Sequence, residues 1–250
     1  PEAFREHVAS LGLDLPCDDA ILPAAESPLS KPLDRITLGG KTPGNRIAIH
    51  PMEGWDGTTS GGVTDEMTRR WQRFGESGAK LVWGGEAVAV TPGGRANPNQ
   101  LCIGPHSPGD LAELRNVLVD AHTECFGSDG DLLVGLQLTH SGRWARPEGG
   151  PAPRTAYQHP MLDGRVGADE GNVLSDDELD ALSEDFVDAA VVADDAGFAF
   201  VDVKACHGYL LHELLSGIDR PGPFGGSLAG RTRFLRQTIE AIRNRVPGPA

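Results

Sequence analysis

The sequence predicts an α/β fold, a (β/α)8 TIM barrel of which about the first four β/α units are present. Short apolar segments bounded by turn and capping residues alternate with amphipathic helical segments, a pattern typical of parallel strands joined by crossover helices. All four strand exits, after His50, Val90, Leu138 and Lys204, lead into long polar or glycine-rich loops. A barrel builds its active site on such loops. A doubly wound nucleotide fold usually opens on a G-x-G-x-x-G or Walker motif, and the sequence contains neither.

Composition and charge restrict the function. The 250 residues carry 22 basic and 36 acidic side chains, a net charge of −14, which argues against binding to nucleic acid or to anionic membranes. No apolar run approaches the roughly 20 residues of a membrane span. The four cysteines are scattered without a C-x-x-C pair. We therefore expect reduced thiols in a cytoplasmic protein rather than a disulfide framework or a zinc knuckle.

The chain divides into two expected parts. Residues 1–34 are interpreted as an N-terminal lead-in, with a short helix over 1–12 and a Pro- and Asp-rich extended stretch. Residues 35–250 are interpreted as an incomplete (β/α)8 barrel whose later strands are missing, because eight units of this size would exceed 250 residues. We expect such a piece, alone, to expose apolar surface and to form homo-oligomers or aggregates.

The first units follow in order. A short hairpin is expected around Gly39-Gly40, and the first strand over 46–50. Thr64 is expected to N-cap an amphipathic helix, because acidic residues fill the first turn and apolar residues recur at helical spacing. The second strand is expected over 81–90.

The later units carry clear helix signals. A helix beginning near Ser107 precedes a strand over 132–138. The polar stretch 143–174 is long for a loop in a compact domain, which usually indicates function. A Ser-x-x-Glu capping box at 175–178 begins the next helix, and a last helix is expected over 228–245.

The densest chemistry follows the fourth strand, which is expected over 198–203. Lys204, Cys206, His207 and Tyr209 come directly after it. Any one of these side chains alone is more typical of a solvated loop or a core aromatic. Four of them at the C-terminal mouth of one buried strand favour a functional site.

Together, the four strand exits resemble those of the old yellow enzyme family of flavin-dependent oxidoreductases. The similarity rests on N-R-I-A-I-H-P-M at 45–52, G-G-E-A-V-A-V-T-P-G-G-R at 84–95, Q-L-T-H-S-G-R at 137–143, H-G-Y-L-L-H-E-L-L-S at 207–216 and F-G-G-S-L-A-G-R-T-R-F-L at 224–235. Each motif is weak alone, but their order is specific. The resemblance implies an FMN-binding (β/α)8 barrel with a short hairpin closing its bottom.

The resemblance also implies a set of residues around FMN. Pro51 and Met52 would lie against the flavin ring through their backbone, and Ala87 would lie near its reactive edge. Gln137 would hydrogen-bond the pyrimidine end, because its amide both donates and accepts. Glu53 stands where many members carry a Cys or Thr that tunes the flavin, and an ionised carboxylate there should lower the flavin reduction potential.

On the substrate side, the resemblance implies that His207 faces the substrate over the flavin and that Tyr209 is the proton donor. Lys204 stands where the family usually has a His that clamps the substrate carbonyl. An ammonium can still stabilise a developing oxyanion, as a point charge rather than a fixed donor. The family's ribityl-contacting Arg and its phosphate site come from later strands, which would lie beyond Ala250, so this segment alone is expected to bind FMN poorly.

The implied reaction is the NAD(P)H-driven reduction of an activated C=C bond in a small-molecule enone, enal or dienoyl-type substrate. Hydride comes from the flavin, and Tyr209 supplies the proton. The residues leave three alternatives open. Lys204 could be the nucleophile of a Schiff-base lyase or aldolase. His50, His140 and His207 could serve a metallohydrolase, although the missing H-x-H pair disfavours one. The chain could also be an inactive barrel fragment.

Overall fold

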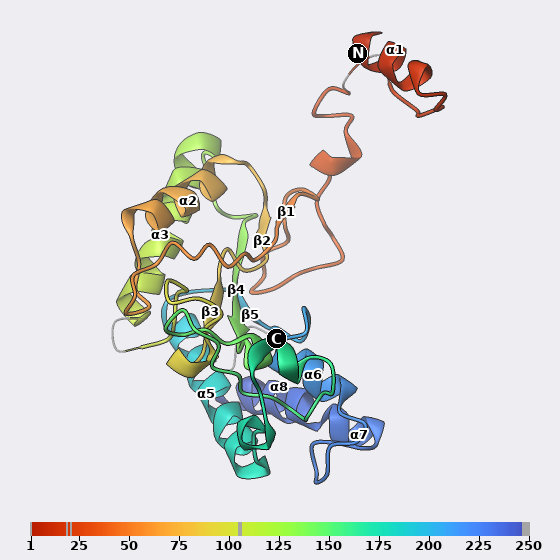
Figure 1. The fold of residues 1–250 in the computed structure, drawn as a ribbon. Coiled ribbons are helices and arrows are strands. Elements are labelled where there is room, and N and C mark those ends of the chain that lie inside the picture. Colours follow the sequence, from red (N-terminus) through yellow and green to blue (C-terminus); the bar gives the residue numbers. More distant parts are fainter. Residues whose placement is uncertain (1, 19, 21, 105–106, 247–250) are drawn as a thin grey trace.

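The structure is a computed structural model that describes residues 2–18, 20, 22–104 and 107–246. Figure 1 shows the N-terminal segment extending away from a body in which helices lie against a parallel sheet. The last four residues of the expected barrel part, 247–250, lie outside the described residues. None of the described helices is both long and apolar enough to cross a bilayer.

Short parallel strands form the sheet. They are β1 (Ala48–Ile49), β2 (Leu81–Val82), β3 (Ala87–Ala89), β4 (Leu133–Thr139) and β5 (Phe200–Val203). β1 pairs with β2, β2 and β3 both pair with β4, and β4 pairs with β5, in each case parallel. The predicted parallel pairing is therefore confirmed. Because the strands share one direction, their C-terminal ends and the loops that follow lie at one end of the sheet.

The prediction of one continuous strand over 81–90 is wrong, because β2 and β3 are separate. Gly84 and Gly85 lie between them, and Gly85 has a φ of +46°. A Cβ atom on Gly84 would lie 2.8 Å from the Cβ of Pro51, and one on Gly85 would lie 2.7 Å from the indole ring of Trp71. Only glycine fits this close approach, and the resulting bend separates the two halves while both stay paired with β4.

The structure describes eight helices, two of which begin at the expected caps Thr64 and Ser175. They are α1 (Glu2–Ser10), α2 (Asp65–Glu76), α3 (Ser107–Phe126), α4 (Asp163–Val166), α5 (Asp176–Asp195), α6 (Leu210–Ser216), α7 (Leu228–Arg231) and α8 (Arg233–Arg245), with 3-10 turns at Pro28–Ser30, Pro92–Gly94, Gly142–Trp144 and Glu170–Asn172. The hydroxyl of Thr64 accepts a hydrogen bond of 3.3 Å from the Met67 N–H, and Ser175 and Glu178 form the capping box of α5. These local signals satisfy N–H groups that have no partner inside the helix.

Two helical expectations differ from the structure. The helix expected over 228–245 is interrupted at Thr232, whose hydroxyl donates to the carbonyl of Leu228 at 2.8 Å, a local bond that competes with helix continuation. The sequence pattern also gives no sign of α6, because its seven residues are too few for periodicity and are mostly apolar. In the structure, Tyr209 is the N-cap of α6 and lies directly after the loop that follows β5.

Side chains of β4 alternate between two surroundings, as expected of a strand. Leu136 and Leu138 pack into the hydrophobic core together with Leu114 of α3. Gln137, between them, points to the other side of the sheet, where its amide reaches Asp202 of β5. The apolar core therefore lies between the sheet and the helices, and polar groups face the barrel interior.

The contact between α2 and α3 depends on Gly75. A Cβ atom at Gly75 would lie 2.2 Å from the carbonyl oxygen of Leu118. We expect Gly75→Ala to lower the free energy of unfolding by about 1–3 kcal/mol through overpacking. Chemical denaturation of the full-length protein would measure this loss. It should appear even though alanine favours a helix interior by about 1 kcal/mol over glycine.

Gly109 in α3 provides a matched control. No described atom lies within 4 Å of the Cβ position at Gly109, so Gly109→Ala should stabilise the protein by a few tenths to about 1 kcal/mol. Equal effects of Gly75→Ala and Gly109→Ala on the free energy of unfolding would contradict the close approach of α2 and α3.

Candidate active site

Four residues expected to contact a flavin form one surface at the C-terminal ends of the strands. Ala87 of β3 is the register partner of Gln137 of β4. The Ala87 N–H donates to the carbonyl of Met52 at 3.2 Å. Pro51 completes the surface beside Gly84, whose Cβ position is 2.8 Å from Pro51 and 3.0 Å from the backbone nitrogen of Gln137.

The polar groups on this surface leave capacity for a ligand. The amide Nε2 of Gln137 donates to Asp202 at 2.6 Å, and no described residue donates to its Oε1. The hydroxyl of Thr139, two residues further along β4, also has no hydrogen-bond partner among the described residues, but its side chain is 0% exposed and is closed to a ligand on this surface. Both positions are paired in register with small side chains, Ala87 and Ala89. A flat molecule with polar edges, such as a flavin, fits this arrangement.

Glu53 joins two of the three residues expected on the substrate side, Lys204 and Tyr209. One carboxylate oxygen accepts from Lys204 Nζ at 2.7 Å, and the other accepts from the hydroxyl of Tyr209 at 2.8 Å. The Lys204 ammonium also lies 4.3 Å from the centroid of the Tyr209 ring. The side chains of Glu53 and Lys204 are only 9% and 8% exposed, so water screens this pair weakly.

The surroundings of Tyr209 keep its hydroxyl protonated. Burial raises the pKa of Tyr209, and the negative charge and hydrogen bond of Glu53 raise it further. Both effects disfavour the phenolate. Tyr209 is therefore a neutral phenol over the whole range in which proteins are usually studied, as a proton donor must be before it acts.

His207 lies outside this cluster. It is exposed, its φ is +61°, and its Nδ1 lies 2.9 Å from the Sγ of Cys206. Together with Tyr209, Trp55 and Trp144 it lines a cavity of about 480 Å³. Among the described non-glycine residues, only Trp55 and His207 have a positive φ. Strained backbone of this kind gathers at functional sites, so this cavity is the expected substrate side.

A second polar network anchors the loop that carries Glu53. The N–H of Gly54 donates to Glu86 at 3.1 Å. Arg70 of α2 bonds both Asp56, at 2.8 and 3.0 Å, and Glu86, at 2.6 Å. Our reading of the sequence assigns no role to Arg70 or Glu86. The one available signal is a carboxylate inside the apolar run 84–90.

A third network ties the loop after β4 to α6. The guanidinium of Arg143 is fully buried and donates to Glu213, to Asp163 and, at 2.7 Å, to the carbonyl of Tyr157. Glu213 also accepts from the N–H of Ala156 at 2.9 Å. The sequence signals for this network are a charged residue within the apolar run of α6 and the Arg that ends the third strand motif.

Two buried titratable groups at the strand ends have displaced pKa values. Burial lowers the pKa of His140 to about 4, and its Nδ1 accepts a hydrogen bond of 3.1 Å from the N–H of Gly142. Burial raises the pKa of Glu86 to about 7, although Arg70 acts in the opposite direction. His140 is therefore neutral in the folded protein at neutral pH, while Glu86 titrates near neutrality.

These two groups should give opposite pH dependences of stability. The contribution of His140 is complete above its ordinary pKa of 6.5 and is lost as the pH falls towards about 4. That of Glu86 is complete below its ordinary pKa of 4.5 and is lost as the pH rises through about 7. Each shift corresponds to about 3 kcal/mol across its window. The two slopes oppose each other between pH 4.5 and 6.5.

We expect that substituting one of the two residues will leave the pH dependence of the free energy of unfolding that is due to the other. Glu86→Gln should make the free energy of unfolding of the full-length protein rise more steeply with pH, and His140→Gln should make it rise less steeply or fall. Urea denaturation at several pH values between 5 and 6.5 measures both slopes. A change of the same sign in the two variants would contradict the assignment.

Two of the alternative readings lose support from this geometry. The Nζ of Lys204 is held by the carboxylate of Glu53 at 2.7 Å, whereas a Schiff-base nucleophile must be a free amine. Among the described residues, no three His, Cys, Asp or Glu side chains lie close enough to share a metal ion, as the metallohydrolase reading of His50, His140 and His207 requires.

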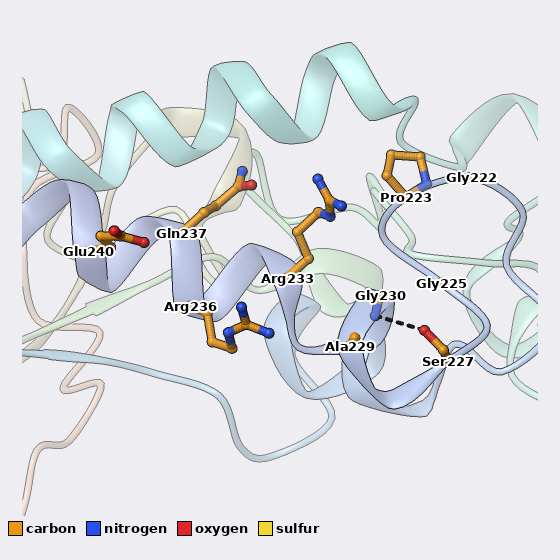
Figure 2. A pocket seen from close by; sticks show the side chains of 10 residues that line it. All are labelled: Gly222, Pro223, Gly225, Ser227, Ala229, Gly230, Arg233, Arg236, Gln237 and Glu240. Atoms are coloured by element: carbon orange, nitrogen blue, oxygen red, sulfur yellow. Dashed lines mark hydrogen bonds between the residues drawn. The ribbon is translucent and has the colours of Figure 1, made fainter.

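A separate hollow of about 510 Å³ lies between the loop after α6 and α8. Figure 2 shows Arg233 and Arg236 along α8, and the N–H of Gly230 donating to the hydroxyl of Ser227 at 3.1 Å. Both arginines are exposed. None of the residues expected in the active site lines this hollow.

Comparison with known proteins agrees with the geometry. Residues 30–248 match the sequence profile of the NADH:flavin oxidoreductase / NADH oxidase family. An NADH:flavin oxidoreductase of Gibberella zeae is 27% identical over 258 residues, covering 93% of this chain and 58% of that protein. An NADPH dehydrogenase of Bacillus velezensis is 32% identical over 212 residues, covering 82% of this chain and 57% of that protein. The chain thus spans less than two thirds of these relatives.

Solved structures agree on the fold. An Old Yellow Enzyme from Pichia sp. superposes with a TM-score of 0.71 at 24% identity, covering 90% of this chain and 58% of that one. An old yellow enzyme homologue from Zymomonas mobilis gives a TM-score of 0.69 at 25% identity, covering 88% and 61%. These likenesses confirm the expected partial (β/α)8 barrel.

Proposed function

This chain belongs to the NADH:flavin oxidoreductase / NADH oxidase family, and from that membership we propose that the full-length protein is an FMN-dependent oxidoreductase. It uses NAD(P)H to reduce the activated C=C bond of a small enone, enal or dienoyl-type compound. The supporting observation is that two side chains after the end of β5, Lys204 and Tyr209, both bond Glu53, the residue that directly follows Pro51 and Met52 in the chain.

The chain's own residues support FMN as the cofactor. The backbone of Pro51 and Met52 and the small side chain of Ala87 would hold the flat ring, and the Oε1 of Gln137 is free to accept a hydrogen bond from its edge. When bound, FMN would supply the hydride-transfer chemistry, with NAD(P)H as the hydride source and the β-carbon of the substrate as the acceptor.

The substrate-side residues supply polarisation and the proton. Asp202 of β5 contacts Gln137, and Lys204 follows two residues later, directly after the end of the strand. Lys204 and His207 would donate hydrogen bonds to the carbonyl oxygen and stabilise the charge that develops there. Tyr209 would give its proton to the α-carbon as hydride reaches the β-carbon. The C=C π bond is broken, and NAD(P)H leaves as NAD(P)+.

The proposal is tested by reducing a small enone, such as cyclohexenone, with the full-length protein and NADPH in D2O. We expect the saturated ketone, with deuterium from the solvent at the α-carbon, as proton delivery by an exchangeable hydroxyl requires. The saturated ketone kept in the same solvent corrects for exchange without reduction. Absence of C=C reduction across enones, enals and dienoyl compounds, with both NADH and NADPH, would overturn the proposal.

The Schiff-base alternative has its own test. A lyase or aldolase would form a covalent adduct between Lys204 and a carbonyl substrate, and borohydride would trap it. We expect no trapped mass on the peptide that contains Lys204, because its ammonium is paired with Glu53 at 2.7 Å. A trapped adduct would favour the lyase over the reductase.

A further inference from the structure

We propose that Glu53 is a positioning residue of the proton-donating side of the site: its carboxylate holds the Tyr209 hydroxyl in its protonated form and keeps the Lys204 ammonium over the Tyr209 ring. This inference rests on the proposed function in giving Tyr209 the role of proton donor. It goes beyond the expectation that an ionised carboxylate at Glu53 lowers the flavin reduction potential.

The contacts of the Glu53 carboxylate support the positioning role. Its two oxygens are used separately, one by Lys204 at 2.7 Å and the other by Tyr209 at 2.8 Å. Lys204 in turn lies 4.3 Å from the centroid of the Tyr209 ring. Each of the three side chains therefore touches the other two. Substituting any one changes the surroundings of the remaining pair.

The backbone on both sides of Glu53 is also fixed. The Met52 carbonyl accepts from the Ala87 N–H at 3.2 Å, and the Gly54 N–H donates to Glu86 at 3.1 Å. The segment is therefore anchored to β3 and to the buried Glu86 before the side chain of Glu53 makes any contact. A carboxylate on an anchored segment can hold its partners without a large loss of conformational freedom.

The remaining groups that face Tyr209 do not replace the carboxylate. The hydroxyl of Ser141 bonds Tyr209 and acts to lower its pKa, whereas Cys206 acts to raise it. Asp202 and Lys204 lie near Cys206. The negative charge in direct contact with the phenol is that of Glu53. Its removal should therefore make Tyr209 more acidic, while the cation of Lys204 stays nearby and favours the phenolate further.

The test is the titration of the phenol at position 209 in the full-length protein. Tyr209 is replaced by 3,5-difluorotyrosine, whose phenol is more acidic, so that 19F NMR can follow its ionisation while the protein is folded. In a Glu53→Gln background we expect the titration midpoint to fall by about one pH unit or more. An unchanged midpoint would overturn the proposal.

Two further variants distinguish positioning from general charge effects. Glu76→Gln removes a partly exposed carboxylate that pairs with Arg73 on α2, and the midpoint should not move. Lys204→Met removes the cation that stabilises the phenolate, and the midpoint should rise or stay where it is. A lower midpoint in Lys204→Met would overturn the proposal even if Glu53→Gln fails to fold.

The titration does not depend on turnover. If the protein fails to reduce C=C bonds, the proposed function is wrong, but the NMR midpoints still show whether Glu53 controls the proton on Tyr209. If reduction is observed, the pH profile is recorded with 3,5-difluorotyrosine at position 209, and its alkaline limb should move to lower pH in the Glu53→Gln background by the same amount as the midpoint. An alkaline limb that stays at the same pH would show that Glu53 does not control proton donation by Tyr209.

Discussion

Tyr209→Phe should slow C=C reduction by about 10²- to 10⁴-fold, the usual loss when a positioned general acid is removed. The phenyl ring keeps the contact with the Lys204 ammonium, which lies 4.3 Å from the ring centroid, and removes only the hydroxyl. Reduction of FMN by NADPH does not need this proton. Its rate should therefore be unchanged in the variant.

Rapid mixing under anaerobic conditions measures the two halves of the reaction separately. Tyr157, the other of the two tyrosines in the sequence, is a matched control. Arg143 bonds its backbone carbonyl, so removing the Tyr157 hydroxyl leaves that hydrogen bond in place. Tyr157→Phe should leave both rates unchanged. Slower reduction by NADPH in Tyr209→Phe, or equal losses in the two variants, would contradict the role of Tyr209 as proton donor.

Arg143→Leu should lower the free energy of unfolding by about 3–5 kcal/mol, because it leaves buried carboxylates without their cation. Arg143 is fully buried, and Glu213 opposite it is only 6% exposed. The pKa of Glu213 is already raised by burial. The loss of Arg143 removes the cation that compensates for this burial, and the loop after β4 would lose its attachment to α6.

Chemical denaturation of the full-length protein checks this loss against a surface pair of the same type. Arg154 and Glu178 form an ion pair with 36% and 47% of their side chains exposed. Arg154→Leu should therefore cost less than about 1 kcal/mol. Similar losses in Arg143→Leu and Arg154→Leu would show that burial of the Arg143 network does not contribute as argued.

The sequence was most informative where a signal is local. The Thr64 cap and the Ser175 capping box begin α2 and α5 as predicted, because both depend on residues three positions apart. The strand motifs at 45–52, 84–95, 137–143 and 207–216 supported the family resemblance, which the profile match confirms. These motifs also indicated the residues that form the surface around Gln137.

Long-range contacts could not be predicted in the same way. Glu53 and Lys204 are 151 positions apart, and Arg143 and Glu213 are 70 apart. No periodicity or spacing connects such partners, because the fold alone brings them together. The resemblance suggested a flavin-tuning role for Glu53 and a substrate clamp for Lys204, but not that the two residues pair. The separation of β2 from β3 likewise depends on how closely Pro51 and Trp71 approach two glycines.

The absorbance spectrum of the purified full-length protein is the first measurement to make, followed by anaerobic addition of NADPH. We expect a flavin band in the visible range that NADPH bleaches and a small enone restores, as an FMN-dependent oxidoreductase requires. A colourless full-length protein that takes up no FMN would contradict the proposed flavin chemistry, even though the barrel and its family membership would stand.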